Sequence, residues 1–217
     1  MTVPKETHVK ICGLREAEHV DAAVEAGAAL TGYVFFPRSP RNVSIAEAAA
    51  LTARVPDGVR KVALVVDADD ELLRAIVDGA GVDTLQLHGH ETPERVRDIR
   101  DTFGLPVMKA LPIADRSDVE TARAYQDVSD LLLFDAKPPQ DATRPGGNAT
   151  AFDWTLLSGT DWSVPWMLAG GLDATNVAEA IRISGAQMVD VSSAVEDDTG
   201  RKDVEKIRDF IAAAHLA

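Results

Sequence analysis

The stretch RKVALVVDADDELLRAIVDGAGVDTLQL, residues 60–87, contains one complete strand–helix–strand unit. Its first part, Arg60–Val66, is rich in β-branched residues and has polar ends, which is typical of a buried strand. The next part, Asp69–Asp78, places Leu73 and Ile76 at helical spacing, and Thr84–Leu87 is again apolar. Because a helix that connects two strands of one sheet is a crossover, the two strands are expected to run parallel.

The same alternation continues through the whole chain. The sequence predicts eight strands in all: Arg60–Val66 and those at His8–Cys12, Leu30–Phe35, Thr84–Leu87, Pro106–Ala110, Asp130–Phe134, Pro165–Ala169 and Met188–Val191. It predicts helices at Glu16–Ala26, Ile45–Arg54, Asp69–Asp78, Pro93–Phe103, Ser117–Tyr125, Phe152–Leu157, Thr175–Ser184 and Asp203–Ala213, with Thr92 and Ser117 as N-caps. Eight such units in 217 residues, about 27 residues each, predict an α/β fold in which residues 1–217 form a single (β/α)8 TIM barrel: eight parallel strands with outer helices.

An open, doubly wound sheet is the competing architecture. It usually carries a Gly-rich dinucleotide-binding turn after its first strand, where this chain has Cys12-Gly13-Leu14-Arg15. The Pro/Gly-rich segment 137–148 is about a dozen residues long and is expected to be a loop, so no linker divides the chain. The barrel is therefore the favoured fold.

The composition excludes several classes of function. The net charge of −13 argues against binding to nucleic acid or to an anionic membrane, because both need clustered Lys and Arg. The single Cys cannot form an internal disulfide, residues 1–6 are polar, and no apolar run is long enough to span a membrane. We expect a cytoplasmic protein with a small-molecule partner.

The C-terminal ends of the strands should carry the chemistry, since TIM barrels build their active sites there. Most chemically competent residues of the chain lie at these ends: Cys12, the segment 36–41, Asp67, residues 88–90, Lys109, Asp135, Gly170-Gly171 and Ser192-Ser193. Position therefore strengthens signals that are weak one by one.

Cys12 and Asp135 are the candidate proton-transfer residues. A lone Cys is usually an inert core residue, but Cys12 ends a strand next to Lys10, whose positive charge is expected to lower the thiol pKa from about 8.5 and favour a thiolate base. Asp135 follows four apolar residues; it either caps the next turn or keeps a proton and acts as a general acid.

Two strand ends predict a phosphate site. Gly170-Gly171 lacks side chains, so the backbone can approach an anion closely. Ser192-Ser193 offers hydroxyl and N–H groups that are expected to open a short helix. Loops in these two places, after the seventh and eighth strands, are the recurrent phosphate site of such barrels.

The remaining polar residues favour structural roles. His88-Gly89-His90 has no carboxylate triad that would support a metal site, so His88 is expected to line the pocket and His90 to lie on the surface. Lys109 is compatible with a Schiff-base aldolase, but pairing with a carboxylate is the more common role.

Short motifs in the right order resemble the phosphoribosylanthranilate isomerase family of tryptophan biosynthesis. The opening VKICGL at residues 9–14 resembles the family's first strand, and GYVFF at 32–36 with Ser39-Pro40-Arg41 resembles its second strand and arginine loop. Further matches are LQLHG at 85–89 with Glu91, LLFD at 132–135, FDW at 152–154, LAGGL at 168–172, Asn176-Val177 and VDVSS at 189–193.

The resemblance implies an Amadori rearrangement of N-(5-phosphoribosyl)anthranilate to 1-(2-carboxyphenylamino)-1-deoxyribulose 5-phosphate. It implies that Asp135 protonates the ring oxygen as general acid, that Cys12 removes the C2 proton as general base, and that Arg41 faces the anthranilate part of the substrate. The expected substrate-binding set comprises Lys10, Arg41, His88, Gly170, Gly171, Asp190, Ser192 and Ser193. No metal or organic cofactor is implied, and the chain is expected to be a monomer or a homodimer.

Two positions depart from the family pattern, and three other functions stay open. Ala149 and Ala194 stand where the family often has Gly, which puts the local loop shape in doubt if either needs a positive φ. An indole-glycerol-phosphate synthase would place Lys and Glu at several strand ends, and only Lys109 is clearly available. A non-catalytic phosphometabolite sensor would need neither Cys12 nor Asp135. Activity on the related histidine-pathway aminoaldose is also left open.

Overall fold

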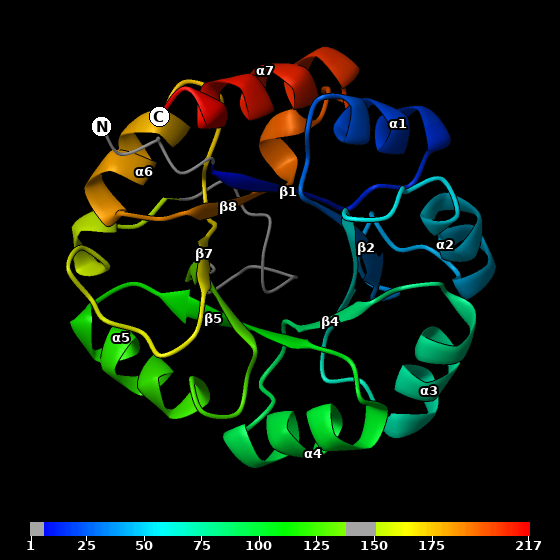
Figure 1. The fold of residues 1–217 in the computed structure, drawn as a ribbon, viewed down its shortest axis with the longest axis horizontal. Coiled ribbons are helices and arrows are strands. Elements are labelled where there is room, and N and C mark those ends of the chain that lie inside the picture. Colours follow the sequence, from blue (N-terminus) through cyan, green and yellow to red (C-terminus); the bar gives the residue numbers. More distant parts are fainter. Residues whose placement is uncertain (1–6, 138–150) are drawn as a thin grey trace.

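The protein is a closed barrel of eight parallel strands in which each strand pairs with its neighbours in chain order. The computed structural model describes residues 7–137 and 151–217. Figure 1 looks down the barrel, with the strands in the centre and the helices outside them. Strand β8 closes the ring on β1 in parallel register, with Lys10 opposite Asp190. The predicted (β/α)8 barrel is therefore confirmed.

All eight predicted strands form, with small changes at their ends. They are β1 (His8–Cys12), β2 (Leu30–Phe35), β3 (Arg60–Val65), β4 (Thr84–Leu87), β5 (Val107–Ile113), β6 (Leu131–Ala136), β7 (Trp166–Leu168) and β8 (Met188–Val191). The largest difference is in β5, which continues past the predicted end at Ala110 because its register with β6 runs on from Met108 to Ile113.

Seven α-helices lie within the described residues: α1 (Ala17–Glu25), α2 (Ile45–Thr52), α3 (Asp70–Gly79), α4 (Pro93–Phe103), α5 (Arg116–Ala122), α6 (Val177–Ser184) and α7 (Val204–His215). Thr92 caps α4 as predicted: its hydroxyl accepts a hydrogen bond from the Arg95 N–H, and Pro93 follows at the first helical position. The prediction of Ser117 as the cap of α5 is wrong. Asp115 caps that helix, because its carboxylate accepts from two backbone N–H groups.

The predicted helix Phe152–Leu157 is only a single 3-10 turn, η2 (Trp154–Leu156). Two other 3-10 turns are η1 (Arg123–Tyr125) and η3 (Ser193–Val195). Asp153 starts η2 by accepting a hydrogen bond from the Thr155 N–H. Ala149 lies outside the described residues.

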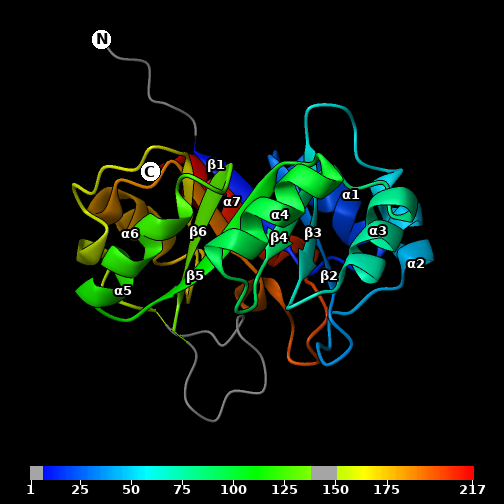
Figure 2. The same cartoon turned by 90° about the horizontal axis from the view of Figure 1, so that it is seen from below.

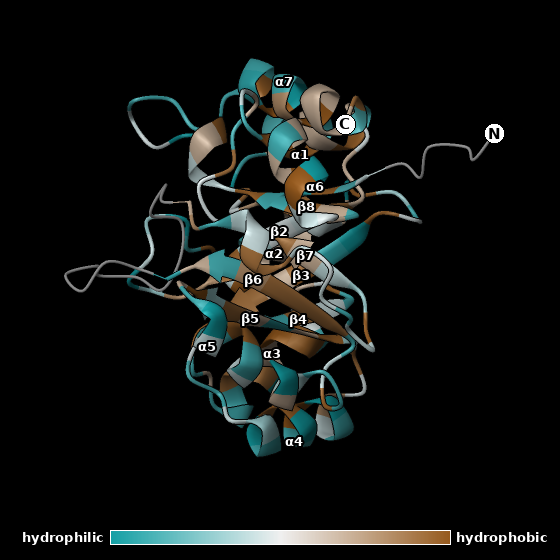
Figure 3. Cartoon of the chain, turned by 90° about the vertical axis from the view of Figure 1, so that its left-hand side faces the viewer, coloured by the Kyte–Doolittle hydropathy of each residue, from teal (hydrophilic) through white to brown (hydrophobic). Residues whose placement is uncertain are grey.

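Two apolar layers hold the barrel together. The inner layer consists of residues on the strands, or directly after one in the case of Ala169, and fills the barrel: Leu30, Val62, Met108, Ala110, Leu131, Leu133, Met167 and Ala169. The outer layer joins the opposite faces of the strands to the helices. Figure 3 shows the apolar colour along β5 and β6 and the hydrophilic colour on the helices outside them. This alternation follows from the two-residue period of a strand.

The segments that follow β2 and β8 leave the barrel on the same side, at the bottom of Figure 2. All strands run parallel, so this side carries the C-terminal strand ends. We call it the mouth. Among the described residues, no helix is both long enough and apolar enough to cross a membrane.

Candidate active site

Strand alternation decides which polar side chains point into the barrel. Val9 and Ile11 of β1 belong to the outer apolar layer, so Lys10 and Cys12 between and after them point inward. By the same argument Asp190 of β8, Gln86 of β4 and Asp135 of β6 point inward as well. The candidate base and the candidate acid therefore both lie inside the mouth, each near the end of its strand.

Lys10 and Asp190 form a buried ion pair directly below Cys12. The Lys10 Nζ donates to the Asp190 Oδ1 at 2.9 Å, and the Lys10 side chain is fully buried. Burial alone lowers the pKa of Lys10, but the charges and hydrogen bonds of Asp190 and Cys12 together outweigh it and the net shift is upward. Lys10 therefore keeps its positive charge next to the thiol.

Burial raises the pKa of the Cys12 thiol above its usual value, because the charged thiolate is disfavoured away from water. The charge and hydrogen bond of Lys10 and the charge of Lys202 oppose this shift, and the charge of Asp190 adds to it. The expectation of a lowered thiol pKa is thus wrong for the protein without substrate. The cation is present as predicted, but desolvation is the larger effect.

Arg41 lies in a second buried ion network on the same side of the mouth. Its Nε and Nη2 donate to the two carboxylate oxygens of Glu196 at 2.6 and 2.8 Å, which is a bidentate pair. Lys202 donates to the same Glu196 at 2.8 Å, and to the Ser192 carbonyl oxygen at 2.7 Å. Burial lowers the pKa of Lys202 to about 8. The charge of Cys12 acts on both Arg41 and Lys202.

Asp135 has a different set of neighbours. Its Oδ1 accepts from the Ala136 N–H at 2.8 Å, and its Oδ2 lies 3.4 Å from the His88 Nε2. The Gln86 amide nitrogen donates to the His88 Nδ1 at 2.9 Å, so that nitrogen is an acceptor. In a neutral ring the proton is then on Nε2, the atom that faces Asp135. The His88 and Asp135 side chains are largely buried but reach solvent.

Gly170 and Gly171 have positive φ values of 86° and 64°, in keeping with the predicted turn. A Cβ on Gly170 would lie only 2.5 Å from the Ala136 backbone nitrogen and 3.0 Å from the Asp135 Oδ1. The missing side chain therefore lets β7 lie close against the end of β6, beside the candidate acid. The Gly171 carbonyl oxygen accepts from the Asn176 side-chain amide at 2.9 Å.

Ser192 and Ser193 follow β8 as predicted, and Ser193 begins the short helix η3. The Ser192 hydroxyl donates to the Cys12 carbonyl oxygen at 3.1 Å, which joins the end of β8 to the end of β1. Asp67 is the sole non-glycine residue with positive φ in the described part of the chain. Ala194 therefore does not need the backbone freedom of glycine.

His90 and Lys109 take the structural roles that were expected of them. The His90 side chain is 93% exposed. Lys109 points out of the barrel, since Val107 and Leu111 on either side of it belong to the outer apolar layer. Its Nζ donates to Glu91 at 2.9 Å and to two carbonyl oxygens, those of Leu87 and Gly89. A Schiff-base aldolase would need this lysine to face the barrel interior.

Two cavities differ in what surrounds them. One of about 300 Å³ lies beside His88 and is also lined by Leu111 and Tyr125. A larger one, about 710 Å³, is lined by His8, Leu30 and other residues at the N-terminal ends of the strands. Volume alone would favour the second, but it lies at the opposite end of the barrel from Cys12 and Asp135.

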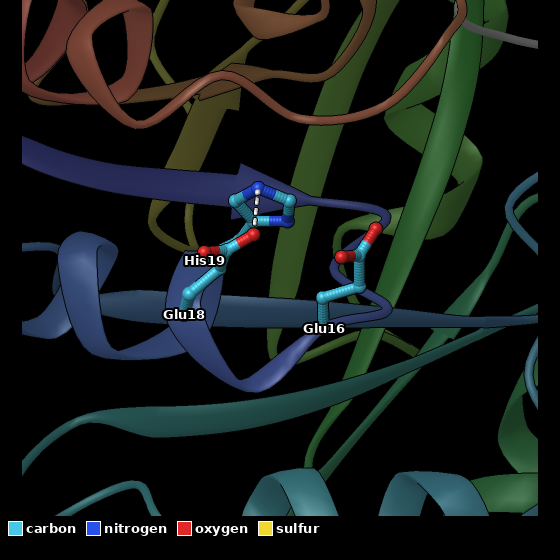
Figure 4. Close-up of side chains that lie close together, drawn as sticks. All are labelled: Glu16, Glu18 and His19. Atoms are coloured by element: carbon cyan, nitrogen blue, oxygen red, sulfur yellow. Dashed lines mark ion pairs between the residues drawn. The ribbon is translucent and has the colours of Figure 1, made fainter.

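Glu16, Glu18 and His19 gather at the start of α1, as Figure 4 shows, with ligand-type atoms within 4.8 Å of one another. The Arg201 guanidinium already bonds both carboxylates: its Nε lies 2.8 Å from Glu16 and its Nη2 lies 2.5 Å from Glu18. A cation of the chain itself therefore occupies this cluster, which favours a structural role over metal binding.

Three residues of the site were not expected from the sequence. Gln86 sits inside a strand, where a buried amide gives no distinctive pattern. Glu196 and Lys202 belong to the charge-rich segment EDDTGRKDVEK, residues 196–206, which reads as a solvated surface. The structure instead buries both side chains against Arg41 and Ser192.

Comparison with known proteins gives one consistent family. Residues 9–213 match the family model described as N-(5'phosphoribosyl)anthranilate (PRA) isomerase. A protein of Paramagnetospirillum magneticum named N-(5'-phosphoribosyl)anthranilate isomerase is 56% identical over 206 residues, which cover 95% of this chain and 96% of that protein.

Solved structures agree with the sequence comparison. Phosphoribosyl anthranilate isomerase from Thermotoga maritima superposes with a TM-score of 0.88 at 33% identity, covering 97% of this chain and 100% of that one. A structure of phosphoribosyl anthranilate isomerase in complex with reduced 1-(o-carboxyphenylamino)-1-deoxyribulose 5-phosphate gives a TM-score of 0.82 at 30% identity, covering 97% of this chain and 100% of that one.

Proposed function

The chain belongs to the N-(5'-phosphoribosyl)anthranilate isomerase family of tryptophan biosynthesis, and on this premise we propose that Asp135 and Cys12 carry the two proton transfers of its reaction. The substrate is N-(5'-phosphoribosyl)anthranilate, and the reaction is its Amadori rearrangement to the aminodeoxyribulose phosphate. One observation supports the choice of these two residues. Both side chains point into the mouth, and the strands that bear them, β6 and β1, flank β7 and β8 in the barrel order.

The acid step belongs to Asp135. Its protonated carboxyl group gives a proton to the ribose ring oxygen while the bond between that oxygen and C1 breaks, and C1 and the anthranilate nitrogen become a Schiff base. The carboxylate that remains faces the His88 Nε2 at 3.4 Å and keeps the hydrogen bond from the Ala136 N–H. A neutral donor stabilises this negative charge less than a lysine or arginine would, so it opposes protonation of the acid less.

The base step belongs to Cys12. Its thiolate removes the proton from C2, and the electron pair moves towards the Schiff-base nitrogen to give an enolamine, which tautomerises to the ketone by taking a proton at C1. The Lys10 ammonium, fixed by Asp190, lies against the sulfur and favours the charged form. Burial has the opposite effect, so the thiolate that acts as base is a minor form of Cys12.

The phosphate is expected to bind at the ends of β7 and β8. Gly170-Gly171 follows β7, and Ser192 with the start of η3 follows β8, so both loops lie between the acid strand and the base strand. A phosphate bound there leaves the ribose between Asp135 and Cys12. Arg41 is expected to meet the anthranilate carboxylate, and its bidentate pair with Glu196 fixes the plane of its guanidinium.

Steady-state turnover of phosphoribosylanthranilate, followed by the loss of its fluorescence, tests the proposal. We expect Cys12→Ala and Asp135→Ala each to lower kcat by at least about 10²-fold, the lower range for general acid–base groups. The two variants should still bind reduced 1-(o-carboxyphenylamino)-1-deoxyribulose 5-phosphate, because neither change removes a phosphate contact. The His90→Ala variant is a matched control, since that side chain is exposed, and it should turn over normally.

Near-normal turnover in either alanine variant would remove that residue from the mechanism. Binding of the reduced compound without turnover in the wild-type chain would support the non-catalytic sensor in place of the isomerase. Parallel assays with the histidine-pathway aminoaldose show whether the same site accepts both aminoaldose phosphates.

A further inference from the structure

The loops after β2 and β8 are held together by one buried ion network. Glu196 bonds Arg41 through both carboxylate oxygens, at 2.6 and 2.8 Å, and one of these oxygens also accepts from Lys202 at 2.8 Å. All three side chains are less than a tenth exposed. Lys202 further donates to the Ser192 carbonyl oxygen, and the Ser192 hydroxyl donates to the Cys12 carbonyl oxygen. The network therefore reaches the backbone of the candidate base.

This side of the mouth contains more buried cations than carboxylates. Two of the ion pairs are complete, Lys10 with Asp190 and Arg41 with Glu196. Lys202 is then a third cation whose carboxylate partner is already fully bonded to an arginine. Among the described residues that make up the two networks, one positive charge is left without an anion of its own. Burying such a charge is costly, so it needs a reason other than stability.

We propose that Lys202 is a positioning residue of the candidate active site, whose unbalanced positive charge supports the Cys12 thiolate and an anionic substrate. The inference rests on the proposed role of Cys12 as base. Two anions can balance this charge: the thiolate that forms on Cys12, and the phosphate that enters beside Ser192. Lys202 acts on both from below the loop and need not touch the reacting atoms.

The surroundings of Lys202 set its pKa at a value that leaves the side chain charged at neutral pH, as a role in supporting the Cys12 thiolate requires. Burial lowers its pKa to about 8, so the side chain is still charged at neutral pH. The other charged or titratable groups that act on Lys202 are Glu196 and Arg41 in its own network, Cys12 on β1 and His19 on α1. The charge of Cys12 raises the pKa of Lys202 and partly offsets the effect of burial.

The thiolate itself gives a direct test, because Cys12 is the only cysteine of the chain. Ultraviolet absorbance of the thiolate is titrated against pH in the full-length protein, with Cys12→Ser as the blank that removes the tyrosine contribution. Lys202 loses its own proton near pH 8, so its charge acts on Cys12 mainly below that pH. We therefore expect Lys202→Met to reduce the thiolate absorbance most at pH 7–8 and to move the Cys12 midpoint up by less than one pH unit. The same change should lower kcat about tenfold at neutral pH, in proportion to the thiolate that is lost. Lys202→Arg keeps the charge and should restore both values.

Arg201→Met is the matched control. Arg201 is the neighbouring cation in the chain, but it is exposed and bonds Glu16 and Glu18. It should leave the Cys12 midpoint and kcat unchanged. Thermal unfolding of each variant tests whether the fold is retained. Lys202→Gln removes the same charge and keeps a hydrogen-bond donor, so it should behave as Lys202→Met does, and it replaces that variant if Lys202→Met is too unstable to titrate.

Wild-type thiolate absorbance at pH 7–8 in folded Lys202→Met would overturn the proposal, and so would an equal loss in Arg201→Met, since the effect would then not depend on the buried site. The absorbance titration needs no substrate. If the wild-type chain did not turn over phosphoribosylanthranilate, the proposed function would fail while this measurement could still be made.

Discussion

Cys12 and Asp135 both point into the mouth near the ends of their strands, but the side chains around them are of different kinds. Around Cys12 lie Lys10 with Asp190 and the network of Arg41, Glu196 and Lys202, joined by ion pairs of 2.6–2.9 Å; we call these residues the base wall. Around Asp135 lie Gln86, His88 and Gly170, the acid wall. Among the described residues in contact with Asp135 or His88, none is a lysine or an arginine.

The difference follows from what each group must do before the reaction. A buried thiol has to lose its proton, so it needs positive charge to offset desolvation. A carboxyl group that is to donate a proton must keep it, and a lysine or arginine close by would favour the carboxylate instead. The base wall supplies cations, and the acid wall supplies neutral hydrogen-bonding groups. Substitutions in the base wall and in the acid wall can each test this difference.

Removing the cation below Cys12 should have the largest effect. Lys10→Met leaves Asp190 buried without its partner and next to the sulfur, so the thiolate loses an attractive charge and keeps a repulsive one. We expect kcat to fall by about 10³-fold and the free energy of unfolding to fall by about 3–5 kcal/mol, as for a broken buried ion pair. Turnover assays and denaturant unfolding measure the two effects.

The double variant Lys10→Met/Asp190→Asn separates charge from structure. It removes both members of the pair, so most of the lost stability should return while kcat stays low. Recovery of kcat together with stability would mean that Lys10 acts only by holding the fold, and the base wall would then have no electrostatic role.

Gly170→Ala should have the next largest effect, and it acts on the acid wall through shape. An alanine there would need the positive φ of 86° and would place its Cβ 2.5 Å from the Ala136 nitrogen, so β7 and the end of β6 must move apart. We expect kcat to fall about 10²-fold, because a displacement of about 1 Å of a catalytic group can cost that much. The free energy of unfolding should fall by at least about 2 kcal/mol.

Gly185→Ala is the control for backbone strain. Its φ of 77° is similar, but a Cβ there would meet nothing within 4 Å. It should lose about 1 kcal/mol of stability and no activity. If Gly170→Ala behaved in the same way, the close approach of β7 to Asp135 would have no part in the reaction.

Much of this arrangement was predictable because it follows local patterns. Alternating strands and helices predicted the closed barrel, and the strand-end rule brought Cys12, Asp135 and the two phosphate loops to one mouth. The ends of the elements were less predictable. Strand β5 continues through Pro112 because its pairing with β6 runs on, and α5 takes Asp115 as its cap although Ser117 is also a good cap residue.

The buried charges could not be predicted, for a physical reason. Glu196 and Lys202 stand among other charged residues, where sequence patterns indicate a solvated surface. Their burial depends on Arg41, 155 positions away from Glu196 in the chain, and on the isolated bridge that pairs Glu196 with Lys202 after η3. The pKa of Cys12 is also a property of the fold, since its direction is set by the balance between desolvation and the neighbouring charges.

Placing a cation in the acid wall should have the smallest effect of the three changes and is the most direct test of the comparison. In the wild type the Gln86 amide donates to the His88 Nδ1. Gln86→Glu replaces this donor with a carboxylate, which can only accept a hydrogen bond and therefore favours a proton on the His88 Nδ1. Both ring nitrogens are then donors, and the imidazole becomes a cation that faces Asp135. The carboxylate form of Asp135 is then favoured, and its proton is harder to donate. We expect kcat to fall about tenfold at neutral pH with little change in KM.

Gln86→Leu is the control, because it removes the amide without adding charge, and it should lower kcat only about two- to threefold. Equal losses in the two variants, measured across the pH range in which both stay folded, would show that the absence of cations around the acid is not what matters.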